Sequence, residues 1–132
     1  MYNKYRNSNQ QNFNSRYEEY VINPFNKDVW GPKLWEVMHT FSFSYPSSPS
    51  NIEKTAAHNF YTSLGVLIPC KNCSQHCLQY VKYYPPKINS RDELVRWVFD
   101  FHNEVNKRLN KRVYTFEELQ EKYNDNVAYC NS

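Results

Sequence analysis

The sequence predicts an all-α protein, built as a four-helix bundle with an additional short fifth helix. Apolar residues recur at helical spacing in successive segments, which prolines or capping residues separate. We find no internal repeat and no pair of segments with strand character. The 132 residues suffice for one domain. We expect a polar, aliphatic-poor arm at residues 1–22, a folded domain at 23–126 and a tail at 127–132.

The first two helices are predicted from their caps and prolines. Asp28 suits the cap of the first helix, and Pro32 suits its first turn, where a missing N–H would be unpaired anyway. Pro46 stops this helix. Ser50 or Asn51 caps the second helix. Its expected apolar face consists of Ala57, Phe60, Leu64 and Leu67.

The third and fourth helices are marked by similar boundaries. Pro69 ends the second helix, so the third is expected from Cys70 to about Tyr83. Ser90 with Glu93 three residues later forms a capping box for the fourth and longest helix. Its expected apolar face consists of Leu94, Trp97, Val98, Phe101, Val105 and Leu109.

The short last helix is predicted from a second capping box. Thr115 and Glu118 form this box, and the helix is expected to end near Asn124. These segments together make the predicted bundle.

Composition excludes several kinds of function. Gly31 and Gly65 are the only glycines, so a glycine-rich phosphate loop of the Rossmann or P-loop kind is excluded. A net charge of +3 is too small to indicate nucleic acid. The longest apolar stretch runs from Leu64 to Ile68, far short of the ~20 residues that span a membrane. We therefore expect neither a nucleic-acid nor a membrane partner.

Three cysteines lie within eight residues, which indicates redox chemistry or metal binding. Cys70 and Cys73 are three apart at a predicted helix start, where they can close a disulfide. The helix dipole and the adjacent Lys71 would lower the pKa of a thiol there. The alternative is a structural zinc site in which Cys77 and a histidine, His76 or His102, complete the ligands. The cysteines alone do not decide between these two readings.

The helix that contains His102 carries polar groups on its inner side. His102 and Asn106 are four residues apart and share a face with apolar residues, so they need polar partners. A bound heteroaromatic molecule would supply such partners. Lys107 and Lys111 are also four apart and could neutralise a pyrophosphate. An ordinary helix C-terminus would explain the cations, but not the two inner polar residues.

With these segments together, the chain resembles the Erv/ALR family of FAD-linked sulfhydryl oxidases, closest to the short forms of large cytoplasmic DNA viruses. The resemblance covers about residues 30 to 125. It rests on four motifs in this order: Trp30-Gly31-Pro32-Lys33-Leu34-Trp35 with His39; Tyr45-Pro46; Pro69-Cys70-Lys71-Asn72-Cys73; and His102-Asn103-Glu104-Val105-Asn106-Lys107-Arg108-Leu109 with Lys111.

The resemblance implies a helical bundle, usually a homodimer, that holds FAD. It implies that Cys70 meets the substrate thiol and that Cys73 lies against the flavin. No metal ion is implied. The residues that the resemblance assigns to FAD are Gly31, Lys33, Trp35, His39, Tyr45, Cys73, His102, Asn103, Val105, Asn106, Lys107, Leu109, Lys111, Lys122 and Tyr123.

The implied activity is disulfide formation in protein thiols, with oxygen as acceptor and hydrogen peroxide as product. Many family members carry a shuttle disulfide in a terminal arm, but residues 1–22 contain no cysteine and Cys130 stands alone near the other end. We therefore expect a substrate, perhaps a small thioredoxin-like carrier, to reach Cys70 directly. A viral protein would act in host cytoplasm or the virion, and a cellular one in an oxidising organelle such as the mitochondrial intermembrane space.

Two other functions remain open from the sequence alone. One is a zinc-stabilised helical binding module that uses Cys70, Cys73 and Cys77. The other is a helical adaptor that keeps the fold and has lost catalysis. The intact cysteine pair and His102 argue against the adaptor. We interpret Cys77 as a small buried hydrophobe.

Overall fold

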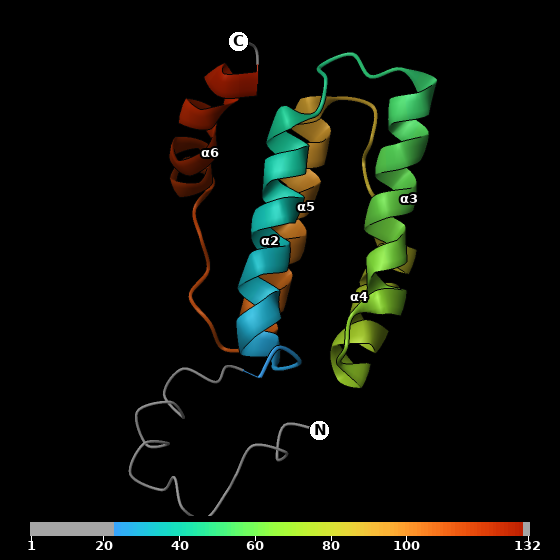
Figure 1. The fold of residues 1–132 in the computed structure, drawn as a ribbon, viewed down its shortest axis with the longest axis vertical. Helices are drawn as coiled ribbons and strands as arrows, with labels where there is room; N and C mark the ends of the chain where they lie inside the picture. Colours follow the sequence, from blue (N-terminus) through green and yellow to red (C-terminus); the bar gives the residue numbers. More distant parts are fainter. Residues whose placement is uncertain (1–22, 131–132) are drawn as a thin grey trace, which may run out of the picture.

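The computed structural model describes residues 23–130, and their side chains as far as Tyr123. The helices of this part are α2 (Lys27–Ser44), α3 (Asn51–Leu67), α4 (Lys71–Tyr83), α5 (Arg91–Arg108) and α6 (Phe116–Cys130). α3 packs on α4, α2 packs on α5, and α6 packs on α2 (Figure 1). This part of the chain contains no strand, so the predicted all-α bundle with an additional helix is confirmed. The arm expected at residues 1–22 lies outside the described residues.

The start of α2 differs from the prediction. Asn26 caps the helix, and its side-chain oxygen accepts from the N–H of Asp28 at 2.9 Å. Asp28 is therefore not the cap, and Pro32 lies inside the helix instead of in its first turn. Pro32 has no N–H to reach the carbonyl four residues earlier. The helix tolerates this loss because that carbonyl belongs to its exposed first turn. The predicted end of the helix at Tyr45 is confirmed.

α3 begins where the sequence predicted, but its buried face is rotated relative to the predicted apolar face. Ser50 caps it in a full capping box with Glu53. The buried residues are Ala57, Tyr61 and Gly65, which repeat every four positions. Tyr61 is 1% exposed and donates its hydroxyl to the carbonyl of Met38 at 2.8 Å, whereas Leu67 is 76% exposed. The expected place of Leu67 in the core was wrong: Leu64 and Ile68 on either side of it pack against the core, so the rotation of α3 turns Leu67 outward.

The capping residues predicted for α5 and α6 are confirmed, but their boxes close differently. The N–H of Glu93 donates to the Ser90 hydroxyl at 3.2 Å, and the N–H of Glu118 donates to that of Thr115 at 3.2 Å. In a full capping box the carboxylate would accept from the backbone N–H of the cap residue, but here each carboxylate accepts from a side chain. Glu93 accepts from the Ser90 hydroxyl, and Glu118 accepts from Arg112 at 3.0 Å. α6 continues to Cys130, six residues beyond its expected end near Asn124.

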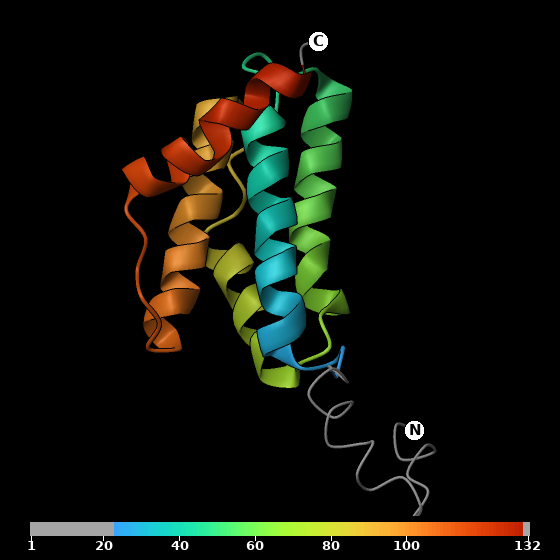
Figure 2. The same ribbon diagram turned by 60° about the vertical axis from the view of Figure 1, so that its left-hand side comes forward.

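The core consists of two apolar clusters that share α2 and α5. The larger joins α2, α3, α4 and α5 around Met38, Tyr61 and Val98. The smaller joins α2, α5 and α6 through Phe43, Val95, Leu119 and Tyr123. Figure 2 shows α6 crossing obliquely over the α2–α5 pair, as this second cluster requires.

The predicted apolar face of α5 is confirmed in the larger cluster. Leu94, Trp97, Val98 and Phe101 are buried, and Val105 is partly buried beside them. Toward its C-terminus the helix is less covered, and Leu109 is only partly buried. No helix in the described residues is both long enough and apolar enough to span a membrane.

Gly65 allows α3 and α4 to approach closely. A Cβ at this position would lie 2.9 Å from Leu78 Cγ and 3.2 Å from the Sγ of buried Cys77. Gly65→Ala is therefore expected to lower the free energy of unfolding by about 1–3 kcal/mol, measured by urea denaturation. Gly31→Ala is the matched control, because nothing lies within 4 Å of its Cβ. The control should stabilise the helix by up to about 1 kcal/mol. Equal effects of both substitutions would contradict the close approach.

Candidate functional site

A cavity of about 720 Å³ opens between α2, α4, α5 and the segment that leads into α6. Its volume lies within the range of about 300–1,000 Å³ that is usual for ligand pockets. Cys70 and Cys73 line it at the start of α4, a part of the wall that we call the cysteine end. His39 and His102 line it where α2 meets α5, a part that we call the histidine end. Aromatic and aliphatic side chains form much of the rest of the wall, including Trp35, Leu64 and Phe101.

The cysteine end is built on the start of α4. Cys70 is the N-cap, and its sulfur accepts from the N–H of Cys73, with 3.3 Å between N and Sγ. A sulfur in this position faces the unpaired N–H groups of the helix start, which stabilise negative charge. The Cys73 thiol and N–H, and then the charge of Lys27, lower the pKa of Cys70. Burial and the neighbouring Cys70 raise the pKa of Cys73. In the dithiol, the thiolate therefore resides mainly on Cys70.

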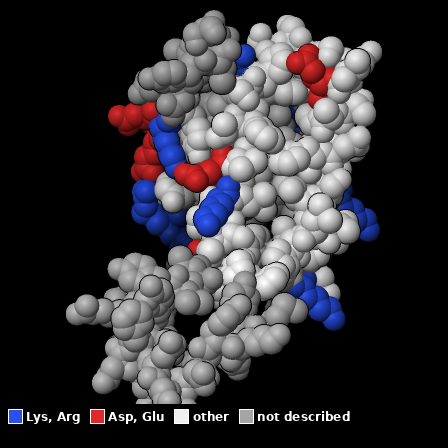
Figure 3. All heavy atoms as spheres, viewed as in Figure 1, with Lys and Arg blue, Asp and Glu red and all other residues white. Residues whose placement is uncertain are grey.

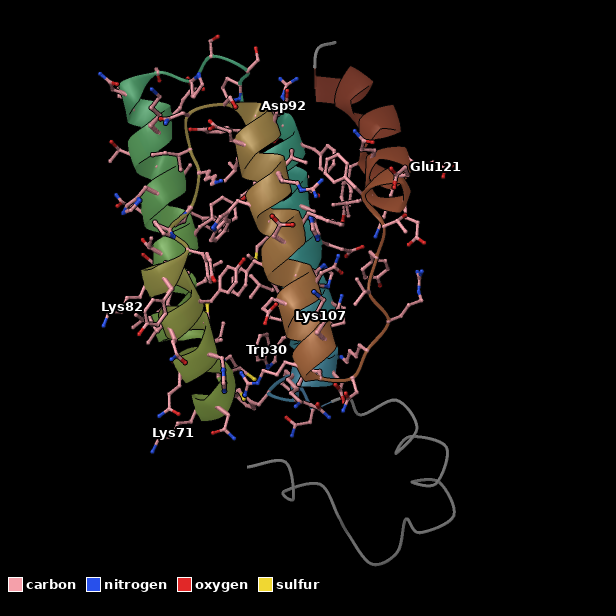
Figure 4. All side chains as sticks on the ribbon, turned by 180° about the vertical axis from the view of Figure 1, so that it is seen from behind. Trp30, Lys71, Lys82, Asp92, Lys107 and Glu121 are labelled. Atoms are coloured by element: carbon pink, nitrogen blue, oxygen red, sulfur yellow. The ribbon has the colours of Figure 1, made fainter. Side chains whose placement is uncertain are left out.

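The cation that acts on Cys70 comes from another helix than the sequence suggested. Lys27 is the first residue of α2 and lines the cavity together with Cys70. Lys71, the predicted cation, makes no contribution to the lowered pKa of Cys70. Figure 4 shows Lys71 directed outward from the base of α4. Arg108, the last residue of α5, lowers the pKa of Cys73.

Cys77 is a third sulfur in the cavity wall, but it is not a reactive one. It is buried one turn beyond Cys73, and burial raises its pKa to about 11. It is thus a neutral thiol at physiological pH, as expected of a small buried hydrophobe. Among the side chains that the structure describes, no three or more Cys, His, Asp or Glu are arranged to hold a metal ion. The geometry does not favour the zinc site considered from the sequence.

The histidine end is held together by ring contacts between α2 and α5. Trp35 stacks on His102, with ring centroids 4.2 Å apart and an interplanar angle of 7°. His39 Nε2 and His102 Nδ1 share a hydrogen bond of 2.8 Å. Tyr123 of α6 lies against His39, with centroids 5.5 Å apart. Three helices therefore meet at this end of the cavity.

Both histidines are neutral at physiological pH. Burial lowers the pKa of His39 to about 3 and that of His102 to about 4. Each neutral ring has one donor and one acceptor nitrogen, so the shared bond uses one nitrogen of each. His39 Nδ1 is buried and has no hydrogen-bond partner among the described residues. An unpaired buried polar atom costs about 1–3 kcal/mol, which a suitable ligand atom would recover.

Lysines surround the histidine end. The charges of Lys111 and Lys122 contribute to the lowered pKa of His102. Lys111 lies 3.8 Å from an oxygen of Asp28, and Lys122 lies 3.9 Å from one of Glu36. All four of these side chains are largely exposed, so the ion pairs are weak.

Most of the residues predicted for a cofactor line the cavity. They are Gly31, Lys33, Trp35, His39, Cys73, His102, Val105, Asn106, Leu109, Lys111, Lys122 and Tyr123. Tyr45, Asn103 and Lys107 lie outside the lining. Tyr45 is buried and donates its hydroxyl to the carbonyl of Ile88 at 2.7 Å. Lys107 is exposed on α5 (Figure 4).

Asn103 is used to hold the segment between α5 and α6. Its amide nitrogen donates to the carbonyl of Tyr114 at 2.8 Å, and its amide oxygen accepts from the N–H of Tyr114 at 2.9 Å. Asn110 turns the chain after α5 with φ of 55°, a conformation that asparagine tolerates better than most residues. The segment therefore returns along α5 and brings Lys111 and Tyr114 to the cavity.

Sequence reasoning missed several residues of the cavity, above all Lys27 and Arg108. Nothing in the local sequence connects Lys27 with Cys70, since they are on different helices. Arg108 belongs to the same basic stretch as Lys107 and Lys111, but only these two lysines were predicted to bind a pyrophosphate. Helical spacing shows which residues share a face, as Arg108 does with Glu104 and Lys107 with Lys111. It does not show which of these faces is turned toward the cavity.

Comparisons with known proteins agree with this geometry. Residues 32–124 match the Erv1 / Alr family. An FAD-linked sulfhydryl oxidase of African swine fever virus is 32% identical over 98 residues, which cover 74% of this chain and 82% of the relative. The mitochondrial FAD-linked sulfhydryl oxidase ERV1 of Saccharomyces cerevisiae is 28% identical over 104 residues, covering 79% of this chain and 55% of the relative.

Two solved structures have a similar fold. The yeast Erv1 core has a TM-score of 0.74 at 28% sequence identity, covering 80% of this chain and 89% of that one. The FAD-binding domain of Erv1 from the same yeast has a TM-score of 0.69 at 29% identity, covering 72% and 90%.

The geometry predicts which thiol reacts first. In the fully reduced protein, Cys70 should be alkylated by iodoacetamide at least ~10-fold faster than Cys77, because only thiolates react. The rate rises with pH as the thiol ionises, and for Cys70 its midpoint should lie below that of a cysteine in an unstructured peptide. Lys27→Ala should move this midpoint upward, whereas Lys71→Ala should leave it in place. Peptide mapping by mass spectrometry measures each site.

A larger effect of Lys71→Ala than of Lys27→Ala would contradict the geometry and restore the interpretation based on the sequence. Faster labelling of Cys77 than of Cys70 would contradict the assignment of the thiolate to Cys70.

Proposed function

The chain belongs to the Erv1/Alr family, and on this premise we propose that it is an FAD-linked sulfhydryl oxidase, which forms disulfide bonds in protein thiols. One observation carries the proposal. The Cys70–Cys73 pair and the His39–His102 pair line one cavity. A dithiol and a site for a flat heteroaromatic ligand thus face the same enclosed space. The sulfhydryl oxidases among the relatives support the same activity.

The residues of the cavity fit FAD. The neutral His102 ring stacked on Trp35 offers an aromatic surface, and Nδ1 of His39 offers a polar contact to a ring system. Lys111 and Lys122 carry positive charge that suits a pyrophosphate. We assign Trp35, His39 and His102 to the rings of FAD, and the lysines to its phosphates. The bound flavin would take an electron pair from the dithiol and pass it to oxygen, which gives hydrogen peroxide.

The chain's own residues perform the thiol chemistry. A substrate thiolate attacks the Cys70 sulfur of the Cys70–Cys73 disulfide, and Cys73 leaves as the thiolate. Lys27 and Arg108 both lower the pKa of Cys73, so they stabilise this leaving group. A second substrate thiol then attacks the mixed disulfide, releases Cys70 and completes the substrate disulfide. We assign the first contact to Cys70, because burial is the main cause that raises the pKa of Cys73.

Protein thiols are the substrates and oxygen is the acceptor in this proposal. A small thioredoxin-like carrier would suit direct access to Cys70, since Cys77, the one other cysteine whose side chain is described, is free and buried. The similarity to an African swine fever virus protein supports action in host cytoplasm or the virion, and the similarity to a mitochondrial yeast protein supports an oxidising organelle. We favour the viral setting, because the viral relative matches across more of its own length.

We also propose that the protein is a homodimer that uses the outer face of α2 and α3. Val37 and Phe41 are exposed on α2, one turn apart. Phe41 packs against Phe60 of α3, with ring centroids 5.3 Å apart. Exposed apolar side chains that adjoin one another in this way are typical of an interface. The face lies on the far side of α2 from the cavity-lining His39, so a second copy would leave the site open.

An absorption spectrum tests the oxidase proposal. The purified protein should show the visible band of a flavin, which bleaches when excess dithiothreitol is added under nitrogen and returns when oxygen is admitted. Cys73→Ala should retain the band and lower the rate of bleaching by at least ~10²-fold, because the pair can no longer transfer electrons. Cys77→Ala is the matched control, a cysteine one turn away, and should bleach at nearly the normal rate.

A colourless protein that cannot be loaded with FAD would refute the proposal. Equal loss of bleaching in Cys73→Ala and Cys77→Ala would refute the assignment of the redox pair.

Sedimentation velocity tests the dimer. Val37→Glu should shift the protein from dimer to monomer at micromolar concentration, because it buries charge in the proposed interface. Val113→Glu is the control, since Val113 is 42% exposed against 40% for Val37 and lies between α5 and α6. A monomeric parent protein, or a dimer that survives Val37→Glu, would show that this face is not the interface.

A further inference from the structure

We propose that this protein selects thiol substrates whose cysteines are flanked by acidic side chains, through a cationic and apolar surface around Cys70. The inference rests on the proposed oxidase function and names its substrate class. We call this surface the thiol-access face, and it consists of Lys27, Val66, Leu67, Cys70 and Lys71.

The fold brings three cationic helix ends together at Cys70. α2 begins at Lys27, α4 begins at Lys71 and α5 ends at Arg108. These ends share one end of the bundle, the lower end in Figure 1, and Figure 4 shows Lys71 there at the base of α4. Lys27 and Arg108 line the same cavity as the cysteines, and both act on the cysteine pair. The cations therefore surround the redox pair from separate elements.

Few carboxylates oppose these cations. Asp28 lies beside Lys27 in the sequence, but its oxygen is 3.8 Å from Lys111. Glu104 lies one turn before Arg108 on α5, and no ion pair joins them in the described part of the chain. Within residues 23–123, Lys27, Lys71 and Arg108 form no ion pair. In the view of Figure 3, the lower part of the side formed by α3 and α4 shows Lys or Arg atoms and no Asp or Glu atoms.

The opposite end of the bundle is different. Acidic and basic residues alternate there, with Glu53 beside Lys54 and Arg91 beside Asp92 and Glu93. Positive charge is thus concentrated at the end that carries the reactive thiol, although the net charge of the whole chain is only +3. A local field of this kind attracts oppositely charged partners.

Apolar side chains complete the thiol-access face. Val66 and Leu67 are 71% and 76% exposed at the end of α3. The chain from Leu67 to Cys70 is three residues long, so their Cα atoms lie within about 11 Å of each other. An extended peptide that presents its cysteine to Cys70 would contact these side chains. Leu67 was expected in the core, and its exposure beside the reactive thiol is what a docking surface requires.

The proposed cofactor does not account for these cations. Lys111 and Lys122 surround the histidine end and act on the histidines. Lys27 acts on the cysteines instead, and Lys71 projects outward. If the cations served only to activate thiols, they would increase the rate with every thiol substrate equally. Selection by charge predicts a preference among substrates that differ only in flanking charge.

The decisive experiment compares two dithiol peptides with one cysteine spacing, flanked by glutamates or by lysines, with dithiothreitol as the uncharged reference. Oxygen consumption by the flavin-loaded full chain gives kcat/KM for each. At low salt the glutamate peptide should exceed the lysine peptide by at least ~10-fold. The ratio should fall below ~3-fold at 0.5 M salt, because salt screens surface charge.

Charge reversal locates the surface. Lys71→Glu should lower the glutamate-to-lysine ratio by at least ~10-fold. Lys82→Glu is the matched control, because it makes the same change at an exposed position near the other end of α4, and it should leave the ratio within about twofold (Figure 4). A ratio taken within one variant cancels any general change in thiol reactivity.

A second measurement is independent of the flavin. In Cys73→Ala, the Cys70 thiolate attacks a peptide pyridyl disulfide at the peptide sulfur, which forms the mixed disulfide and releases pyridinethione. The released chromophore gives the rate, and a glutamate-flanked peptide should react at least ~10-fold faster than a lysine-flanked one at low salt. Lys71→Glu in the same background should reverse this order.

The possible outcomes separate the two proposals. No turnover of dithiothreitol or of either peptide by the flavin-loaded chain would refute the oxidase function itself. Normal turnover of dithiothreitol with equal rates for both peptides would overturn the substrate inference and leave the function standing. Equal effects of Lys71→Glu and Lys82→Glu would also overturn the inference, because net charge and not the thiol-access face would then govern the preference.

Discussion

Trp35 of α2 stacks on His102 of α5, and one turn away His39 bonds the same histidine at 2.8 Å. The packing of the other helices depends on this contact between α2 and α5. Both apolar clusters share α2 and α5, so the pair is the axis on which α3, α4 and α6 are assembled. The cavity lies where this axis is least covered, toward the C-terminus of α5. Its walls therefore belong in large part to the two helices that contribute to both clusters.

Charge divides the cavity into two environments. At the histidine end, burial and the charges of nearby lysines both keep two rings neutral, so the rings offer stacking and hydrogen bonds and no charge. At the cysteine end, the start of α4 and Lys27 stabilise a thiolate. One cavity thus joins neutral aromatic rings to a stabilised thiolate. Redox transfer between a thiol and a flavin requires both.

Local sequence patterns predicted the features that are determined within a single helix, such as its cap and its first residue. Ser50, Ser90 and Thr115 cap their helices as expected, and Cys70 stands at a helix start. Contacts between helices could not be predicted in this way. Lys27 reaches Cys70 from another helix, and Tyr61 replaces Leu67 in the core because the rotation of α3 is set by its partners. Tyr45, Asn103 and Lys107 fall outside the cavity for the same reason. Their roles toward a cofactor remain predictions.

Asn103 holds the main chain of Tyr114 at both its N–H and its carbonyl, and not its ring. A backbone contact of this kind excludes only proline at the residue that it holds. Within the segment from Leu109 to Thr115, Asn110 and Thr115 keep its path by their own side chains and conformation, and the positions between them can vary more freely. Lys111 and Arg112 belong to this segment, so the charges that it displays can change by single substitutions without a new fold. The buried amide of Asn103 thus fixes the path of this segment, whereas its surface charges can be substituted. The charge at the edge of the cavity can therefore evolve independently of the cavity walls.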